Sequence, residues 1–222
     1  MSTWLDTTFA GFDVSIMEAL HRFAVATNGF FTPFMHLFAD LAIVLIVISF
    51  ALLAFKRTRR VGACMFGGIA IGVIFTNVVL KNVVARPRPY VDTARAVYEW
   101  WQYVGAPEEH GICFPSGHTT CAMSGMTGLF LATRKKYSWP GFFFALFMGF
   151  SRVYLMVHYP TDVLAGWVVG AAGAVCAYFI VKAIWRALES HPDNGFCRFA
   201  LEFDLIDIFR KSKKKDDPDK ES

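Results

Sequence analysis

Residues 61–80 read VGACMFGGIAIGVIFTNVVL and contain no charged side chain. A helix of about 20 apolar residues is long enough to cross the hydrocarbon core of a bilayer. A second uncharged stretch runs from Val163 to Val181. Because only helices and closed barrels can span a membrane, these stretches predict a polytopic all-α protein.

The composition points to the same class of protein. Of the 222 residues, 55% are apolar and only 18% are charged, whereas soluble domains carry about 25% charged residues. The net charge is +4, but the basic residues flank the apolar stretches. They do not form a soluble recognition element, so we expect no nucleic-acid partner. The five cysteines show no metal-ligand or paired spacing, and we interpret them mainly as packing residues.

Five stretches are long and apolar enough to be spans, and they lie within a predicted transmembrane domain of residues 31–188. Their approximate limits are 34–55, 61–80, 117–134, 139–157 and 162–184. The third is the weakest prediction, because it is short and contains Ser124 and Thr127.

The positions of the basic residues predict the orientation of the spans. Clusters lie at residues 56–60, 134–136 and 182–186, and more basic residues follow from Arg210 to Lys220. All of them fall on one side if five spans alternate, and positive loops are typically cytoplasmic. We therefore expect a multi-pass protein of the cell membrane, in bacteria the cytoplasmic membrane, with a cytoplasmic C-terminus. Segments 81–116 and 158–161 would then face outward.

The two ends of the chain have a different character. Residues 1–30 contain apolar side chains at helical spacing interrupted by charges, which predicts an amphipathic helix lying at the outer interface. Ser15 and Glu18 fit a capping box within it. Residues 189–222 are expected to form a tail that is partly amphipathic, around residues 199–209, and then disordered. No cleavable signal peptide is visible in the first thirty residues.

The first outward segment carries cations. It runs from Lys81 through Arg86-Pro87-Arg88-Pro89, and we expect the prolines to end the second span. A basic helix end that neutralises lipid headgroups is the simpler interpretation. However, outward positive charge opposes the usual bias, and anion binding would explain it.

The second segment opens the third span with Pro115-Ser116-Gly117-His118. The free N–H groups of a helix N-terminus bind anions, and the glycine permits close approach. His118 would lie at the mouth of this site and could donate a proton. Ser116 could equally be a plain N-cap.

The third segment, SRVYLMVHYPTD, runs from Ser151 to Asp162. Arg152 lies within a predicted span, where a cation is costly without a partner. Asp162 follows His158 by four residues and could accept its Nδ1–H, leaving Nε2 free to attack. Alternatively, the histidine–aspartate pair merely caps the fifth helix.

Together these segments predict a cationic site without a metal ion or other cofactor. No group of carboxylates or Cys/His residues has metal-ligand spacing. Fixed cations can stabilise the equatorial oxygens of a phosphoryl group in the transition state, as Mg²⁺ does elsewhere.

The three segments resemble KxxxxxxRP, PSGH and SRxxxxxHxxxD, the motifs of the type 2 phosphatidic acid phosphatase superfamily, which includes lipid phosphate phosphatases and vanadium-dependent haloperoxidases. Eleven residues match at the expected spacings. Many membrane members have six spans with the first motif ending the third, whereas here it ends the second predicted span. Five spans argue against a haloperoxidase, which is expected to be soluble.

The resemblance implies roles for individual residues. His158 would be the nucleophile that forms a phosphohistidine, Asp162 would orient it, and His118 would protonate the leaving oxygen. Lys81, Arg88 and Arg152 would hold the phosphate oxygens, with Ser116 and the Gly117 amide adding hydrogen bonds. Arg86 lies outside the motif, and we interpret it as a contact to a lipid headgroup.

The expected function is therefore a lipid phosphate or diphosphate phosphatase with a membrane lipid as substrate. Undecaprenyl diphosphate, phosphatidylglycerol phosphate and phosphatidate remain open as substrates. Two alternatives are a lipid phosphotransferase, which passes the phosphate to another lipid, and a non-catalytic lipid-binding or transport protein. Asp40, within the first predicted span, is expected to face the bundle interior and make a structural hydrogen bond.

Overall fold

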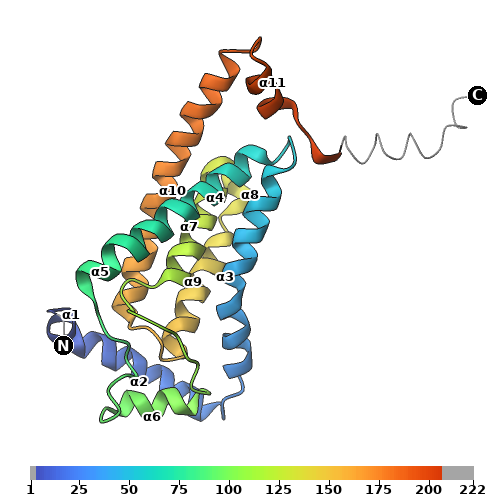
Figure 1. Cartoon of the computed structure of the whole chain (residues 1–222). Coiled ribbons are helices and arrows are strands. Elements are labelled where there is room, and N and C mark those ends of the chain that lie inside the picture. Colours follow the sequence, from blue (N-terminus) through green and yellow to red (C-terminus); the bar gives the residue numbers. More distant parts are fainter. Residues whose placement is uncertain (1–3, 207–222) are drawn as a thin grey trace, which may run out of the picture.

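A computed structural model describes residues 4–206, and every regular element in that range is a helix (Figure 1). The all-α prediction is confirmed. In chain order the elements are α1 (Trp4–Thr8), α2 (Ala10–Ala26), α3 (Thr32–Leu53), α4 (Arg59–Ile74), the π-helix η1 (Phe75–Leu80), α5 (Lys81–Val84), α6 (Ala96–Tyr103), α7 (Gly117–Ala132), α8 (Lys135–Ser138), α9 (Gly141–Tyr154), α10 (Pro160–Glu189) and α11 (Gly195–Glu202).

The five apolar stretches all form helices within a few residues of their predicted limits. Among residues 4–206, three helices are long and apolar enough to cross a membrane: Thr32–Leu53, Arg59–Val84 and Pro160–Glu189. The chain is thus a membrane protein by its helices. Helices α7 and α9 have only 16 and 14 residues, so the count of five spans stays a prediction.

Helix α7 lies at the centre of the bundle, packed between α4 and α10. Small residues allow this close approach. A Cβ added at Gly170 of α10 would come within 2.6 Å of the Thr120 carbonyl oxygen of α7. The Ser124 hydroxyl donates a hydrogen bond to the Gly170 carbonyl at 3.0 Å. The third stretch is short and partly polar because protein, not lipid, surrounds it.

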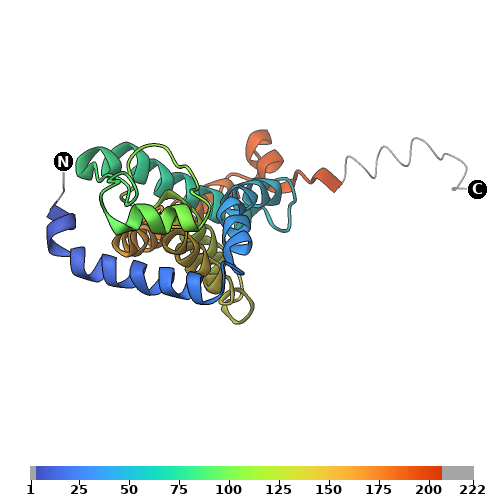
Figure 2. The same cartoon turned by 90° about the horizontal axis from the view of Figure 1, so that it is seen from below.

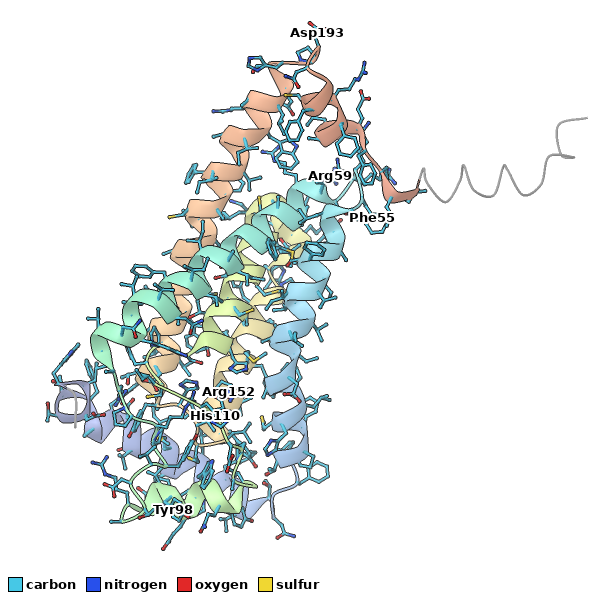
Figure 3. All side chains as sticks on the ribbon, viewed as in Figure 1. Phe55, Arg59, Tyr98, His110, Arg152 and Asp193 are labelled. Atoms are coloured by element: carbon cyan, nitrogen blue, oxygen red, sulfur yellow. The ribbon has the colours of Figure 1, made fainter. Side chains whose placement is uncertain are left out.

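The two ends of the bundle differ in character. Helices α2 and α6 lie at one end, with α2 running across the ends of the bundle helices (Figures 1 and 2). The loop between α3 and α4 lies at the other end, where Figure 3 labels Phe55 and Arg59. The predicted basic clusters within residues 56–60 and 134–136 belong to this second end (Figure 1). Which end faces the cytoplasm stays a prediction.

Helix α2 starts earlier than its proposed capping box. Its N-cap is Phe9, and the Ser15 hydroxyl instead donates to the Gly11 carbonyl at 2.6 Å. The capping-box interpretation is therefore wrong, because Ser15 lies inside the helix. Asp13, interpreted from the sequence as a charge that prevents α2 from spanning, is completely buried against the rest of the protein.

The amphipathic tail helix also begins before the predicted position. Helix α11 starts after Asn194, whose side chain accepts hydrogen bonds from the Phe196 and Cys197 amides. Arg59 holds the helix against the bundle through hydrogen bonds to the Ala200 carbonyl, at 2.6 Å, and to the Phe203 carbonyl. The end of the predicted amphipathic segment, residues 207–209, and the part of the tail predicted to be disordered, from residue 211 on, lie outside the described residues.

Candidate active site

His158 lies in the short loop between α9 and α10 and is 1% exposed. Its Nδ1 is 3.4 Å from Oδ2 of Asp162, in the first turn of α10. The same Oδ2 accepts the Tyr159 amide at 2.9 Å and so caps the helix. The catalytic and the capping interpretations of this pair are therefore compatible, since one carboxylate oxygen serves both contacts.

Two buried arginines lie beside His158. Arg88, in the loop after α5, places Nη1 at 3.3 Å from His158 Nε2 and donates to the Val157 carbonyl at 3.0 Å. Arg152, in the last turn of α9, is 3% exposed. The guanidinium group of Arg88 therefore lies on the Nε2 side of the imidazole, opposite Asp162.

His158 and Arg88 border an open pocket of about 450 Å³, whereas Arg152 is not among the residues that line it. Residues from the three sequence segments that line it are Lys81, Arg88, Gly117, His118 and His158. Lys81 directly follows the π-helical turn η1, and π-helical turns often occur at functional sites. The structure does not bring Ser116 to the pocket wall. Its hydroxyl is fully buried and accepts a hydrogen bond from Thr119 at 2.9 Å, so its phosphate contact stays a prediction.

Glu109 places its carboxylate among the cationic and histidine side chains. Its Oε2 is 2.5 Å from Arg88 Nη1 and 3.5 Å from His158 Nε2, and its Oε1 forms an ion pair with Arg152. His118 Nδ1 is 3.7 Å from Oε1. One carboxylate thus touches or approaches four of the predicted site residues, as a phosphate anion would.

The aromatic segment before Glu109 positions this carboxylate. The Tyr90 hydroxyl donates to the Glu109 carbonyl at 2.8 Å and accepts the Glu109 amide at 3.2 Å. Tyr90 in turn stacks on Trp101, with ring centroids 4.4 Å apart. The aromatic residues of segment 90–113 on their own indicate only an interfacial anchor or a headgroup entrance. Nothing in the sequence around Glu109 indicates that its carboxylate contacts the cations of the site.

Arg86 does not contact the membrane surface, and its assignment to a lipid headgroup is wrong. Its side chain is 1% exposed and forms ion pairs with Asp6, Asp13 and Asp162. The three carboxylates pair with the buried guanidinium group, so its charge is compensated inside the protein and not at a lipid headgroup.

Burial away from water lowers the pKa of His158 to about 4, and the nearby Arg88 and Arg152 act in the same direction. The hydrogen bond to Asp162 partly opposes this shift. The imidazole is consequently neutral near pH 7, which is the form that can attack an electrophile.

The other side of the pocket is apolar. Ala42, Ile43 and Ile46 of α3 line it together with Val73 of α4. Ile43 is 67% exposed on the outer surface of the bundle. The labels of Arg152 and His110 in Figure 3 mark the end of the bundle at which the pocket lies. The pocket therefore extends from the charged side chains to the apolar surface of α3 and α4.

Asp40 of α3 does not behave as expected. It is exposed, and the described residues provide no hydrogen bond to its side chain. The prediction of a structural hydrogen bond inside the bundle is therefore wrong. Its carboxylate lies near enough to His118 and Arg152 to interact with both electrostatically.

The chain is similar to known proteins both in sequence and in fold. A sequence model of the PAP2 superfamily matches residues 61–186. The undecaprenyl-diphosphatase of Sulfolobus acidocaldarius is 31% identical over 162 residues, which are 72% of this chain and 74% of that protein.

Two solved structures have a similar fold. LpxE of Aquifex aeolicus superposes with a TM-score of 0.61 at 21% identity, over 75% of this chain and 94% of that one. A transmembrane PAP2-type phosphatidylglycerolphosphate phosphatase from Bacillus subtilis gives a TM-score of 0.55 at 26% identity, over 78% and 86%. The chain therefore belongs to the PAP2 superfamily and is a membrane lipid phosphatase.

Proposed function

We propose that this phosphatase hydrolyses the terminal phosphate of a polyprenyl diphosphate of the undecaprenyl diphosphate class, at the outer membrane surface, through a phosphohistidine at His158. The observation that carries the proposal is the position of the Glu109 carboxylate. It marks a place where one anion contacts Arg88 and Arg152 and lies 3.5 Å from His158 Nε2. A phosphoryl group bound there would have its phosphorus within reach of that nitrogen.

The first chemical step transfers the phosphoryl group to the enzyme. Nε2 of His158 forms a bond to phosphorus while the bond from phosphorus to the leaving oxygen breaks. His118, on the wall of the pocket, starts as the imidazolium and gives its proton to that oxygen, which leaves its ring neutral. Asp162 accepts the Nδ1–H of His158 and stabilises the positive charge that develops on the ring.

The second step returns the enzyme to its starting state. Water attacks phosphorus, the P–N bond breaks and inorganic phosphate leaves, while His118 accepts the proton of the water. Lys81, Arg88 and Arg152 stabilise the charge on the equatorial oxygens in both transition states. In this mechanism, the three cations carry out a task that many phosphoryl-transfer enzymes assign to Mg²⁺.

The apolar wall of the pocket supports a lipid substrate. Ala42, Ile43 and Ile46 continue from the cationic end along a helix that is apolar enough to span a membrane. A substrate could therefore keep its hydrocarbon chain in the bilayer while its phosphate reaches His158. The similarity to an undecaprenyl-diphosphatase favours a polyprenyl chain, while the structural similarity to a phosphatidylglycerolphosphate phosphatase keeps a glycerophospholipid as the second candidate.

The test is phosphate release by the purified protein from a panel of lipid phosphates in detergent. The panel contains undecaprenyl diphosphate, phosphatidylglycerol phosphate and phosphatidate. We expect the highest kcat/KM for the diphosphate, and enzyme quenched in alkaline SDS should carry alkali-stable, acid-labile phosphate on His158. A preference for phosphatidylglycerol phosphate would contradict the substrate assignment. Formation of a new phospholipid when a second lipid is added would identify a phosphotransferase.

A further inference from the structure

Arg86 lies directly behind the His158–Asp162 pair, on the side away from the pocket. We propose that Arg86 is a positioning residue for the phosphatase reaction, which orients Asp162 and through it His158, and that Asp13 of α2 completes this arrangement. The inference rests on the proposed role of His158 as the nucleophile. It assigns a function to an arginine outside the three motifs and to a helix that precedes them.

The two oxygens of Asp162 have separate partners. Oδ2 faces His158 and the Tyr159 amide, at 3.4 and 2.9 Å. Oδ1 accepts a hydrogen bond from Arg86 Nη1 at 2.8 Å. A carboxylate held at both oxygens cannot rotate about its Cβ–Cγ bond without breaking a charge-assisted hydrogen bond. Arg86 therefore fixes the direction in which Oδ2 meets the imidazole.

Arg86 is itself held on all sides. Nε donates to Asp6 at 2.8 Å, Nη2 donates to Asp13 at 2.8 Å, and Nη1 also donates to the Thr161 hydroxyl at 2.7 Å. The Tyr159 ring covers the guanidinium plane, with its centroid 3.7 Å from Cζ. Each nitrogen of the guanidinium thus has a partner in a fixed planar arrangement. A lysine ammonium could retain the charge but not this geometry.

Asp13 ties the start of α10 to α2. Its Oδ1 accepts the Thr161 amide at 2.9 Å, and its Oδ2 accepts the Thr161 hydroxyl at 2.8 Å as well as Arg86. Thr161 directly precedes Asp162. Helix α2 therefore fixes the backbone that carries Asp162, while Arg86 fixes its side chain.

Three substitutions test this role: Arg86→Met, Arg86→Lys and Asp13→Asn. The control is Arg22→Met, which removes an arginine of α2 whose side chain is 76% exposed. Two quantities are measured on full-length protein in detergent: kcat for undecaprenyl diphosphate, and the inhibition constant of inorganic phosphate. Phosphate reports the anion pocket formed by Lys81, Arg88 and Arg152, which none of the substitutions alters.

We expect Arg86→Met to lower kcat roughly 10- to 100-fold, as removal of groups that orient a reactive residue commonly does. The inhibition constant of phosphate should stay within about twofold of the wild-type value. Arg86→Lys should recover part of kcat, Asp13→Asn should lose several-fold, and Arg22→Met should match the wild type. This separation of kcat from anion binding would not result from general loss of structure, which lowers both.

Two results would overturn the inference. One is wild-type kcat in the Arg86 variants, and the other is a rise in the phosphate inhibition constant that matches the loss of rate. If Arg86→Met does not fold, the test relies on Arg86→Lys and Asp13→Asn. A wild-type kcat in both of these variants would refute the positioning role of Arg86. Failure of the proposed function is a separate result, because then the wild-type protein itself would release no phosphate.

Discussion

Oε2 of Glu109 lies 2.5 Å from Nη1 of Arg88, on the side of His158 where a phosphate would bind. The carboxylate must leave before a phosphate can pair with Arg88 and Arg152. We expect Glu109→Gln to lower the inhibition constant of inorganic phosphate about tenfold, equivalent to about 1.4 kcal/mol of binding free energy. The reason is that the neutral glutamine no longer competes with phosphate for Arg88 and Arg152.

The matched control for this change is Glu108→Gln. Glu108 is the exposed neighbour of Glu109 and forms no ion pair among residues 4–206, so its substitution should leave phosphate inhibition unchanged. Weaker phosphate inhibition in Glu109→Gln would mean that the carboxylate helps to hold the substrate.

Replacement of the nucleophile should abolish turnover without unfolding the protein. We expect His158→Ala to lose at least about 1000-fold in kcat, the scale typical of removing a catalytic nucleophile or base. The variant should elute from size-exclusion chromatography as the wild type does. Substantial residual activity with incorporation of phosphate at another residue would refute the assignment.

The pH dependence should reflect the buried position of His158. Burial lowers the pKa of its imidazole to about 4, and only the neutral ring attacks phosphorus. Activity should therefore persist as pH falls through 6.5, the ordinary value for histidine, and disappear near pH 4. The measurement is kcat/KM against pH, corrected for the second ionisation of the substrate phosphate near 6. An acidic limb that stays at 6.5 after this correction would contradict the prediction.

Chelation and vanadate test the proposed use of fixed cations. Activity should survive EDTA, because the proposed mechanism assigns charge stabilisation to Lys81, Arg88 and Arg152. Vanadate should inhibit the wild-type protein by adopting the five-coordinate geometry of the transition state, and it should bind more weakly to the inactive His158→Ala variant. Loss of activity in EDTA that added Mg²⁺ restores would overturn this part of the mechanism.

The packing of α7 against α10 predicts a stability effect. Alanine normally favours a helix over glycine by about 1 kcal/mol, but a Cβ at Gly170 would lie 2.6 Å from the Thr120 carbonyl oxygen. Overpacking of this kind costs about 1–3 kcal/mol. Gly170→Ala should therefore lower Tm in detergent by several degrees. Gly11→Ala, where a Cβ meets nothing within 4 Å, is the control and should not lower it.

The sequence was sufficient to predict the helices and the motif side chains. Runs such as 61–80 have a composition that only a buried or lipid-covered helix tolerates, so their limits are visible without a structure. His158 and Asp162 are four residues apart at a helix start, and this local spacing determines their contact. Local patterns of this kind need no knowledge of how distant segments pack.

The remaining features depend on contacts between distant parts of the chain. Asp13 meets Arg86, 73 residues away, and Thr161, 148 residues away. From the sequence, Asp13 is a charged residue on a mainly apolar helix, and Arg86 is one of several cations near the membrane surface. Nothing in the sequence shows that these two side chains meet. Glu109 was missed for the same reason, since its loop reaches the pocket only because Tyr90 and Trp101 hold it there.

Asp6 and Asp13 both precede residue 61, where the match to the PAP2 superfamily begins. A shortened protein that starts at that residue would keep every motif side chain yet lack two of the three carboxylates around Arg86. Arg86 would then be a buried cation with Asp162 as its one remaining carboxylate partner. A protein trimmed to the homologous region should consequently be poorly active, the more so because it would also lack α3, whose Ala42, Ile43 and Ile46 line the pocket.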